Sequence, residues 1–189
     1  MKGIRKLCDE EGILMICDEV QCGMGRTGAM FAWQAYDIKP DIMSMAKAIG
    51  SGIPVGAFAM TEEVAKYSLE PGDHGTTYGG NPLACTAVSK TIEIFEKKHL
   101  VEHVQKVGAY LTKKLEELVE EYDTVKAVKG KGLMQGIQVT KPISEITGAA
   151  LKEGLLIIGA GSDVIRFVPP LIIELEQVDE MIRILKKAL

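Results

Sequence analysis

The sequence predicts an α/β fold with a mostly parallel sheet, followed by a smaller α+β portion. Two observations indicate this. In the first half, short apolar runs that are typical of strands covered on both faces alternate with helical patterns. After about residue 100 the pattern changes to a long amphipathic helix and then to short strands. We therefore expect two domains, at residues 1–100 and 101–189.

The first domain is predicted to open with a helix that ends at Glu11, where Gly12 can stop it. The uninterrupted apolar run Ile13–Cys17 predicts a strand buried on both faces. Thr61 is predicted to cap a helix that has acidic residues in its first turn. The other predicted elements are strands at 41–46 and 55–60, a loop at 71–82 and a buried Ala-rich helix at 83–95.

The second domain is predicted to begin with an amphipathic helix over residues 101–122, whose Lys and Glu residues share one side. Short strands and two further helices complete it. The strands are expected at 125–128, 133–139, 155–158 and 164–168, and the helices at 144–153 and 176–189.

Composition narrows the class of function. The 189 residues are 47% hydrophobic and 25% charged, which is ordinary for a globular protein. The net charge of −4 makes nucleic acid an improbable partner, and no apolar run approaches the roughly 20 residues of a membrane span. The cysteines have no C-x-x-C spacing, so we expect reduced thiols in a cytoplasmic protein and no metal site. They are Cys8, Cys17, Cys22 and Cys85.

Asp18 and Lys47 carry the main functional signal. Asp18 comes just after an apolar run, where its carboxylate can pair with a cationic ring nitrogen or simply cap a turn. Lys47 ends another apolar run, and small residues follow it. Desolvation there favours a free, nucleophilic amine, although a surface lysine with a buried stem is the alternative. An acid and a lysine of this kind suit pyridoxal 5′-phosphate (PLP).

Two further features predict anion binding. Residues 75–82 (GTTYGGNP) combine glycines, hydroxyls and a helix start, which suits a phosphate, although a turn-rich connector explains them equally well. Arg166 lies among apolar residues, and its permanent charge requires a partner. That partner is either a substrate carboxylate, bound bidentately, or the acid of a structural salt bridge.

Four motifs in order resemble those of the class III PLP-dependent aminotransferases, and the resemblance runs over essentially the whole chain. They are ICDEVQ at 16–21, GMGRTG at 23–28, AKA at 46–48 and HGTTYGGNP at 74–82. The resemblance implies PLP-dependent transferase fold type I, with residues 1–100 in the cofactor-binding large domain and 101–189 as the small domain. In this family Lys47 would hold PLP covalently, Asp18 would pair with its ring nitrogen, Val20 would pack on the ring and Gln21 would reach its phenolic oxygen.

The resemblance also implies roles for three other residues. Thr77, helped by Thr76, would bind the cofactor phosphate of a partner subunit, so that a homodimer shares its active sites. Arg166 would bind the substrate carboxylate. The reaction would transfer the amino group of N-acetylornithine, or of a related ω-amino donor, to 2-oxoglutarate in arginine biosynthesis. Ornithine, 4-aminobutyrate and succinyl-diaminopimelate are the alternative donors.

The resemblance covers only the C-terminal half of the family pattern. We expect the aromatic that stacks on the ring, the first phosphate loop and the acid that partners Arg166 to lie outside this sequence. The sheet would then have an exposed edge. A different hypothesis is therefore a non-catalytic remnant that self-associates.

Overall fold

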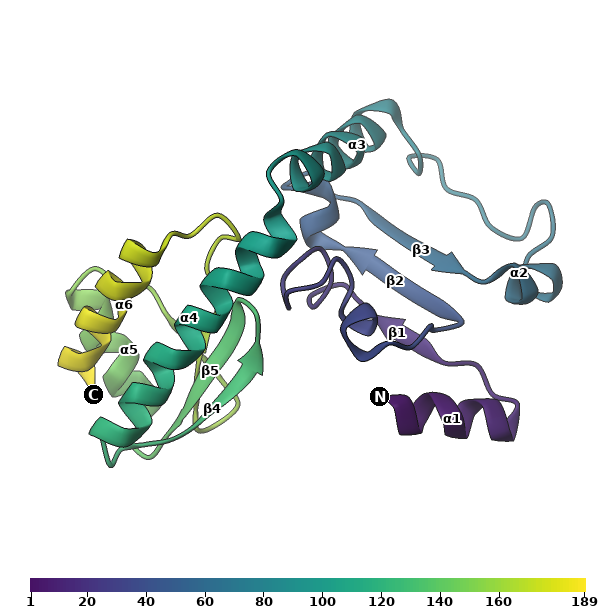
Figure 1. Cartoon of the computed structure of the whole chain (residues 1–189). Coiled ribbons are helices and arrows are strands. Elements are labelled where there is room, and N and C mark those ends of the chain that lie inside the picture. The colour runs from purple at the N-terminus through teal and green to yellow at the C-terminus, as the bar shows by residue number, and fades with distance from the viewer. The chain divides into compact units, whose positions relative to one another are not determined.

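A computed structural model describes residues 1–189, which form two compact units (Figure 1). The first unit comprises Met1–Gly25 and Ala29–Leu100, and the second comprises Arg26–Gly28 and Val101–Leu189. The roles of residues 1–100 and 101–189 as cofactor-binding and small domains stay a prediction. Each unit is described separately.

The first unit contains a three-stranded sheet in the order β1-β2-β3. Strand β1 runs parallel to β2, with Asp18 opposite Ser44, and β3 runs antiparallel to β2. The strands are β1 (Ile16–Asp18), β2 (Ile42–Ala46) and β3 (Gly56–Met60). The helices are α1 (Lys2–Glu11), α2 (Glu62–Ser68) and α3 (Pro82–Lys97), together with the 3₁₀ helices η1 (Ala32–Tyr36) and η2 (Lys47–Gly50).

Helix ends in this unit follow the sequence signals. Gly12 has a φ of 62° and ends α1, a backbone conformation in which glycine carries no steric penalty. Thr61 caps α2, because its side-chain oxygen accepts a hydrogen bond from Val64 N at 3.4 Å. Asn81 caps α3 in the same way, with Ala84 N as the donor at 3.0 Å.

The predicted burial of two elements is wrong. The strand begins at Ile16 rather than Ile13, and Ile16 is 65% exposed. Alternate residues point to opposite faces of a strand, so Ile16 lies on the face opposite to Met15 and Cys17. Only the face with Met15 and Cys17 is packed, in a small cluster that includes Trp33. Helix α3 likewise buries only Ala84, Thr91 and Phe95, and it leaves Leu83 68% exposed.

Asp41 joins the elements of the first unit just before β2. Its Oδ2 accepts hydrogen bonds from Met15 N at 2.7 Å and from the Arg5 guanidinium at 2.6 Å. Its backbone N–H donates to Met15 O at 2.9 Å, and its carbonyl accepts from Thr61 N at 2.9 Å. One residue therefore fixes helix α1 and the start of β1 against β2 and the end of β3.

We expect the Asp41 carboxylate to make stability depend on pH. Partial burial opposes its ionisation, but the bonds from Met15 N and Arg5 outweigh burial and lower the pKa of Asp41. The contribution of the Asp41 carboxylate to the free energy of unfolding is therefore complete above its unfolded-state pKa of about 3.9. This contribution is lost as pH falls through the lower pKa of Asp41 in the folded state. The free energy of unfolding of Asp41→Asn should fall below wild type at pH 6, and the gap should narrow in acid. A gap that is constant with pH would contradict this account.

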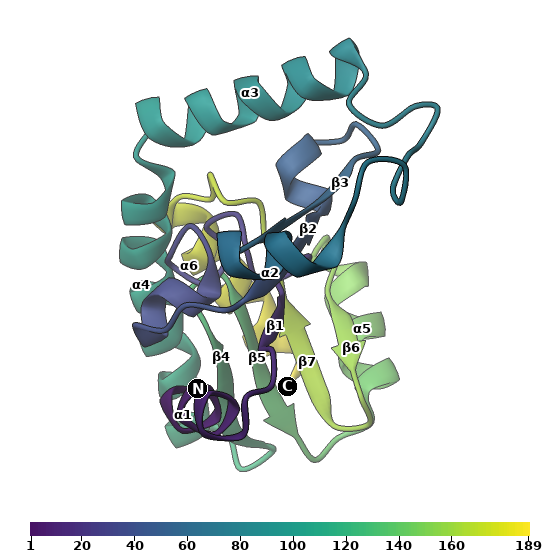
Figure 2. The ribbon, with the colours of Figure 1, turned by 90° about the vertical axis from the view of Figure 1, so that its right-hand side faces the viewer.

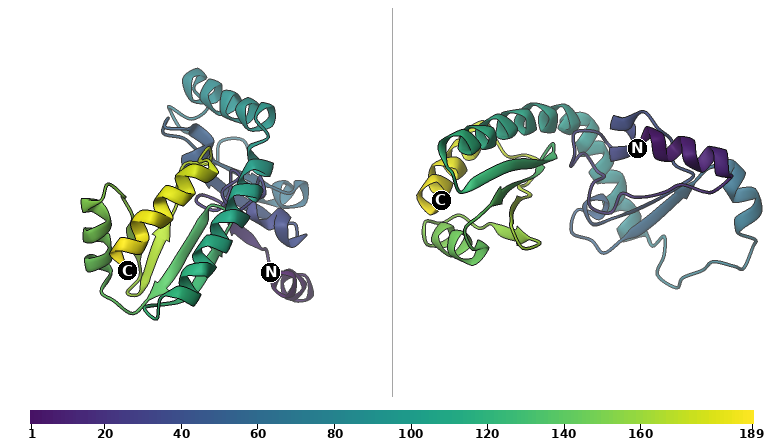
Figure 3. Two further views of the ribbon diagram at one scale, coloured as in Figure 1. Left: turned by 60° about the vertical axis from the view of Figure 1, so that its left-hand side comes forward. Right: turned by 90° about the horizontal axis from the view of Figure 1, so that it is seen from below.

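The second unit is a four-stranded antiparallel sheet with three helices packed along it (Figures 2 and 3). The strand order is β4-β5-β7-β6. The strands are β4 (Val125–Lys131), β5 (Met134–Val139), β6 (Ile158–Ala160) and β7 (Val164–Phe167). The helices are α4 (Leu100–Glu121), α5 (Ile143–Lys152) and α6 (Leu175–Ala188).

The core of the second unit lies between this sheet and its helices. Leu111, Leu115 and Leu118 of α4 are fully buried and recur at helical spacing. They pack with Ile137 of β5 and Ile165 of β7, which are also fully buried. These residues belong to one continuous hydrophobic cluster that covers one face of the sheet. No helix of the chain is both long and apolar enough to cross a membrane.

Candidate active site

The two residues singled out from the sequence lie at one edge of the first sheet. Asp18 is the last residue of β1, and Lys47 directly follows β2. Because β1 and β2 are parallel, both strands end at the same side of the sheet. In open α/β sheets, ligands bind outside the carboxyl ends of the strands. The topology therefore brings an acid and an amine to the expected ligand-binding edge.

The Asp18 carboxylate is exposed and is oriented by two hydrogen bonds. Its Oδ1 accepts from Val20 N at 3.0 Å and from Ser44 Oγ at 3.2 Å. The first bond is the turn cap that the sequence allowed as an alternative. Both bonds use Oδ1, so Oδ2 is left for a ligand donor.

Lys47 is exposed, so the desolvation predicted from its apolar neighbours is wrong for this chain. The flanking strand residues are only half-buried, and no element of the chain covers the amine. Its backbone has a φ of 50°, which costs a residue other than glycine about 1–3 kcal/mol. No ion pair engages its side chain. Its amine is therefore available to a ligand.

The turn after β1 carries the other residues predicted to touch a cofactor ring. Val20 is half-buried and Gln21 is exposed. Glu19 carries no separate functional signal in the sequence, and it is 3% exposed. In this turn the Glu19 side chain is therefore buried, while Gln21 is accessible to a ligand.

The loop with the predicted phosphate ligands connects α2 to α3. Thr76 and Thr77 are both exposed, and no hydrogen bond joins them to Asp18 or Lys47. The Asn81 side chain braces the loop by donating to Tyr78 O at 2.8 Å. A Cβ at Gly79 would lie 2.0 Å from a Thr76 methyl carbon, so a larger residue there would displace the Thr76 side chain. The hydroxyls remain accessible on a loop that is held at its end.

Arg166 belongs to the second unit and lies on β7, opposite Gly136 of β5. Its Nε is buried without a hydrogen-bond partner, and no carboxylate lies within ion-pairing distance. The structural salt bridge that the sequence left open is therefore absent. A buried guanidinium nitrogen without a partner is costly, which favours an anionic ligand.

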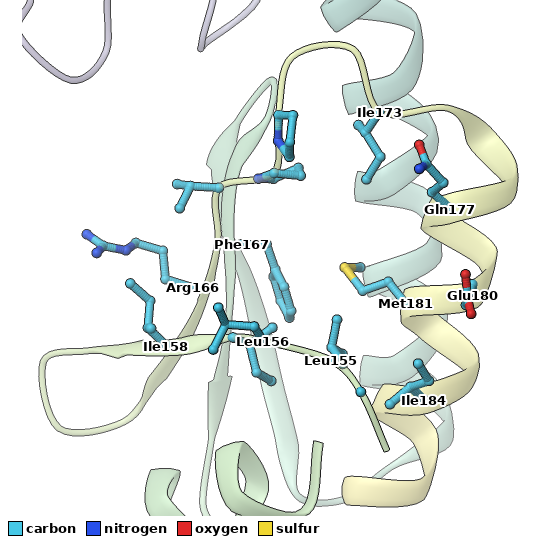
Figure 4. Close-up of a pocket in the computed structure, with 15 residues that line it drawn as sticks. Leu155, Leu156, Ile158, Arg166, Phe167, Ile173, Gln177, Glu180, Met181 and Ile184 are labelled. Atoms are coloured by element: carbon cyan, nitrogen blue, oxygen red, sulfur yellow. The ribbon is translucent and has the colours of Figure 1, made fainter. Parts of the chain in front are cut away.

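Arg166 and its neighbour Phe167 point to opposite sides of β7 (Figure 4). Phe167 faces a cavity of about 500 Å³ that Met181 and Ile184 also line. Arg166 borders this cavity, but its guanidinium is directed away from Met181. The apolar cavity is therefore not the place where this guanidinium would bind a ligand.

Arg26 is a second arginine, and it lies within the GMGRTG motif at 23–28. Its Nη1 donates to Leu133 O at 3.1 Å and to Pro169 O at 2.6 Å, and burial lowers the pKa of its guanidinium. Continuing the β5–β7 register from Gln135 opposite Phe167 brings Leu133 opposite Pro169. Proline has no N–H to donate to the ladder. The Arg26 guanidinium donates to Leu133 O in place of the missing proline N–H. It thereby holds the segment that follows β7, the strand that carries Arg166, against the start of β5.

No group of three or more His, Cys, Asp or Glu side chains is arranged to hold a metal ion.

Comparison with known proteins gives a consistent result. A family model described as aminotransferase class-III matches residues 1–189. The acetylornithine aminotransferase of Methanocaldococcus jannaschii is 47% identical over 185 residues, which are 98% of this chain and 46% of the relative. That of Clostridium acetobutylicum is 44% identical over 190 residues, covering 100% of this chain and 49% of the relative.

Solved structures agree. The ornithine delta-aminotransferase of Plasmodium falciparum has a TM-score of 0.92 and 33% identity, covering 99% of this chain and 50% of that chain. The acetylornithine aminotransferase of Elizabethkingia anophelis has a TM-score of 0.91 and 32% identity, covering 99% of this chain and 48% of that chain. This chain spans about half the length of the curated relatives it matches.

Proposed function

The chain belongs to the class III aminotransferases, and from this premise we propose that it takes part in a PLP-dependent transamination. The amino group of N-acetylornithine, or of a related ω-amino donor, is transferred to 2-oxoglutarate, a reaction of arginine biosynthesis. Similarity to enzymes named acetylornithine aminotransferase supports this donor. The single observation that carries the proposal is the meeting of Asp18 and Lys47 at one edge of a parallel strand pair.

The residues at this edge fit PLP. Asp18 has a carboxylate oxygen without a protein donor, which suits a protonated ring nitrogen, and Lys47 has an amine without an ion-pair partner, which suits an aldehyde. When bound, PLP supplies the aldehyde that takes up the amine and a ring that withdraws electrons from the reacting carbon. We assign Val20 to a face of the ring and Gln21 to its phenolic oxygen.

Lys47 has a second role in this proposal. Its Nζ holds and returns the proton of the substrate carbon that bears the amino group, as a general base and then a general acid. Hydrogen bonds from Val20 N and Ser44 Oγ orient the Asp18 carboxylate for its proposed contact with the cofactor ring. The strained backbone of Lys47 is in keeping with a residue held for function.

The proposal also assigns roles in anion binding, one to each unit. Arg166 binds a substrate carboxylate, supported by its buried and unpartnered Nε. Thr77, with Thr76, binds the cofactor phosphate of a partner subunit in a homodimer. Their exposure within one chain fits a role toward a second subunit.

The test is glutamate formation by the purified chain with PLP and 2-oxoglutarate, measured for several donors. We expect N-acetylornithine to be used in preference to ornithine, 4-aminobutyrate and succinyl-diaminopimelate, and the signal to vanish in Lys47→Ala. Glutamate formed from 4-aminobutyrate but not from N-acetylornithine would contradict the donor. No glutamate from any donor would contradict the activity of this chain.

A further inference from the structure

We propose that Glu19 is a positioning residue that holds the turn with Asp18, Val20 and Gln21 in its ligand-binding conformation, an inference that rests on the proposed function. Glu19 lies between residues assigned to the cofactor, yet it is 3% exposed. Its side chain therefore faces the protein interior and acts through its neighbours.

The Glu19 carboxylate binds the start of η1. Its Oε2 accepts from Ala32 N at 2.9 Å, and its Oε1 accepts from Trp33 N at 3.0 Å. These N–H groups open a 3₁₀ helix of five residues, where they have no partner within the helix. The Cys22 Sγ lies 3.4 Å from Oε2 and 3.2 Å from Asp18 O, so its single proton is shared between these two acceptors. A buried carboxylate without a cationic partner is stabilised here by two backbone donors.

The Cys22 thiol stays protonated in this arrangement. Burial, together with the nearby charge of Glu19, raises the pKa of Cys22 to about 11. Its thiol therefore keeps its proton at neutral pH and can donate to Asp18 O or to Glu19.

The backbone of Glu19 closes the turn from the other side. Glu19 N donates to Ser44 O at 3.0 Å, which extends the contact between β1 and β2 by one residue. Glu19 O accepts from Gly23 N at 3.0 Å. A Cβ at Gly23 would lie 2.7 Å from that same oxygen and 3.1 Å from Phe31, so the turn has no room for a side chain there.

These contacts fix the two ends of the segment that carries Val20 and Gln21. Asp18 Oδ1 also bonds Val20 N, so motion of the turn would move the carboxylate as well. Removal of the Glu19 carboxylate would leave the part-buried N–H donors of Ala32 and Trp33 without this acceptor. We therefore expect its loss to weaken cofactor binding although Glu19 touches no cofactor.

Trp33 provides a local reporter, because it is the only tryptophan of the chain. Its N–H binds Glu19, and its half-buried side chain packs on the Cys8, Met15 and Ile38 cluster. Emission and acrylamide quenching of Trp33 therefore report whether the η1 anchor is intact. This readout needs neither cofactor nor activity.

The test compares the full chain with Glu19→Ala and Glu19→Gln. Glutamine keeps the shape but has only one acceptor atom, so it can bind one of the two N–H groups. We expect red-shifted emission and stronger quenching of Trp33, with a PLP dissociation constant raised about 10-fold or more by Glu19→Ala and less by Glu19→Gln. If the alanine variant does not fold, the glutamine variant alone carries the test.

Thr61→Ala is the control for a general loss of stability, because it removes the α2 cap and leaves the turn untouched. Its PLP affinity should match wild type. Wild-type Trp33 quenching in Glu19→Gln, or PLP affinity reduced no more than in Thr61→Ala, would overturn the positioning role. Failure of the wild-type chain to form an adduct at Lys47 would instead overturn the proposed function, while the Trp33 comparison would still decide whether Glu19 anchors η1.

Discussion

Lys47→Ala is expected to abolish the covalent PLP adduct. Schiff-base formation needs an unprotonated amine at the cofactor aldehyde, and Lys47 follows β2 at the edge where β1 presents Asp18. Borohydride reduction of the chain mixed with PLP, followed by intact-mass measurement, counts the adducts. We expect one per wild-type chain and none in the variant.

The matched control is Lys66→Ala, which removes another exposed lysine of the first unit, in helix α2. It should retain one adduct per chain. An unchanged adduct count in Lys47→Ala would mean that PLP reacts with surface lysines, and the assignment of Lys47 would be wrong.

Arg166→Met is expected to weaken binding of 2-oxoglutarate by about 100-fold. A bidentate pair between a guanidinium and a carboxylate contributes about 3 kcal/mol, which corresponds to that factor. Methionine preserves much of the stem that packs on the sheet. Arg166→Lys should give an intermediate loss, because it retains the charge without the planar pair of donors. Calorimetric titration of the full chain with 2-oxoglutarate measures each affinity.

Arg183→Met serves as the control for Arg166, because Arg183 is an exposed arginine of the same unit. Its affinity for 2-oxoglutarate should equal that of wild type. Equal affinities for wild type and Arg166→Met would show that this guanidinium does not bind the carboxylate.

Local sequence signals predicted most elements well. The helix that ends at Gly12 is confirmed, because its stop depends on one backbone conformation that glycine adopts freely. The amphipathic helix predicted at 101–122 is confirmed as α4, since its buried leucines recur at the helical period. The four short strands after it are also confirmed in order, although β6 begins later than predicted.

Burial was less predictable than element type. Ile16 and Leu83 are apolar residues within the expected elements, but both are more than half exposed. An apolar run shows that a residue can be buried, but it does not identify the element that covers it. For the same reason the predicted desolvation of Lys47 was wrong.

The supporting residues of the candidate site could not be read from local pattern. Arg26 bonds Leu133 and Pro169, which are 107 and 143 positions away in the sequence. Glu19 bonds the backbone of Ala32 and Trp33, and backbone donors leave no signature in residue type. Arg166 was recognisable because a permanent charge among apolar residues requires a partner wherever it lies.

The central claim is that the edge formed by β1 and β2 recognises PLP. Peptide mass mapping of the wild-type chain after reaction with PLP and borohydride tests it most directly. A single phosphopyridoxyl group on Lys47 is the predicted result. No adduct, or adducts scattered over several lysines, would contradict the claim.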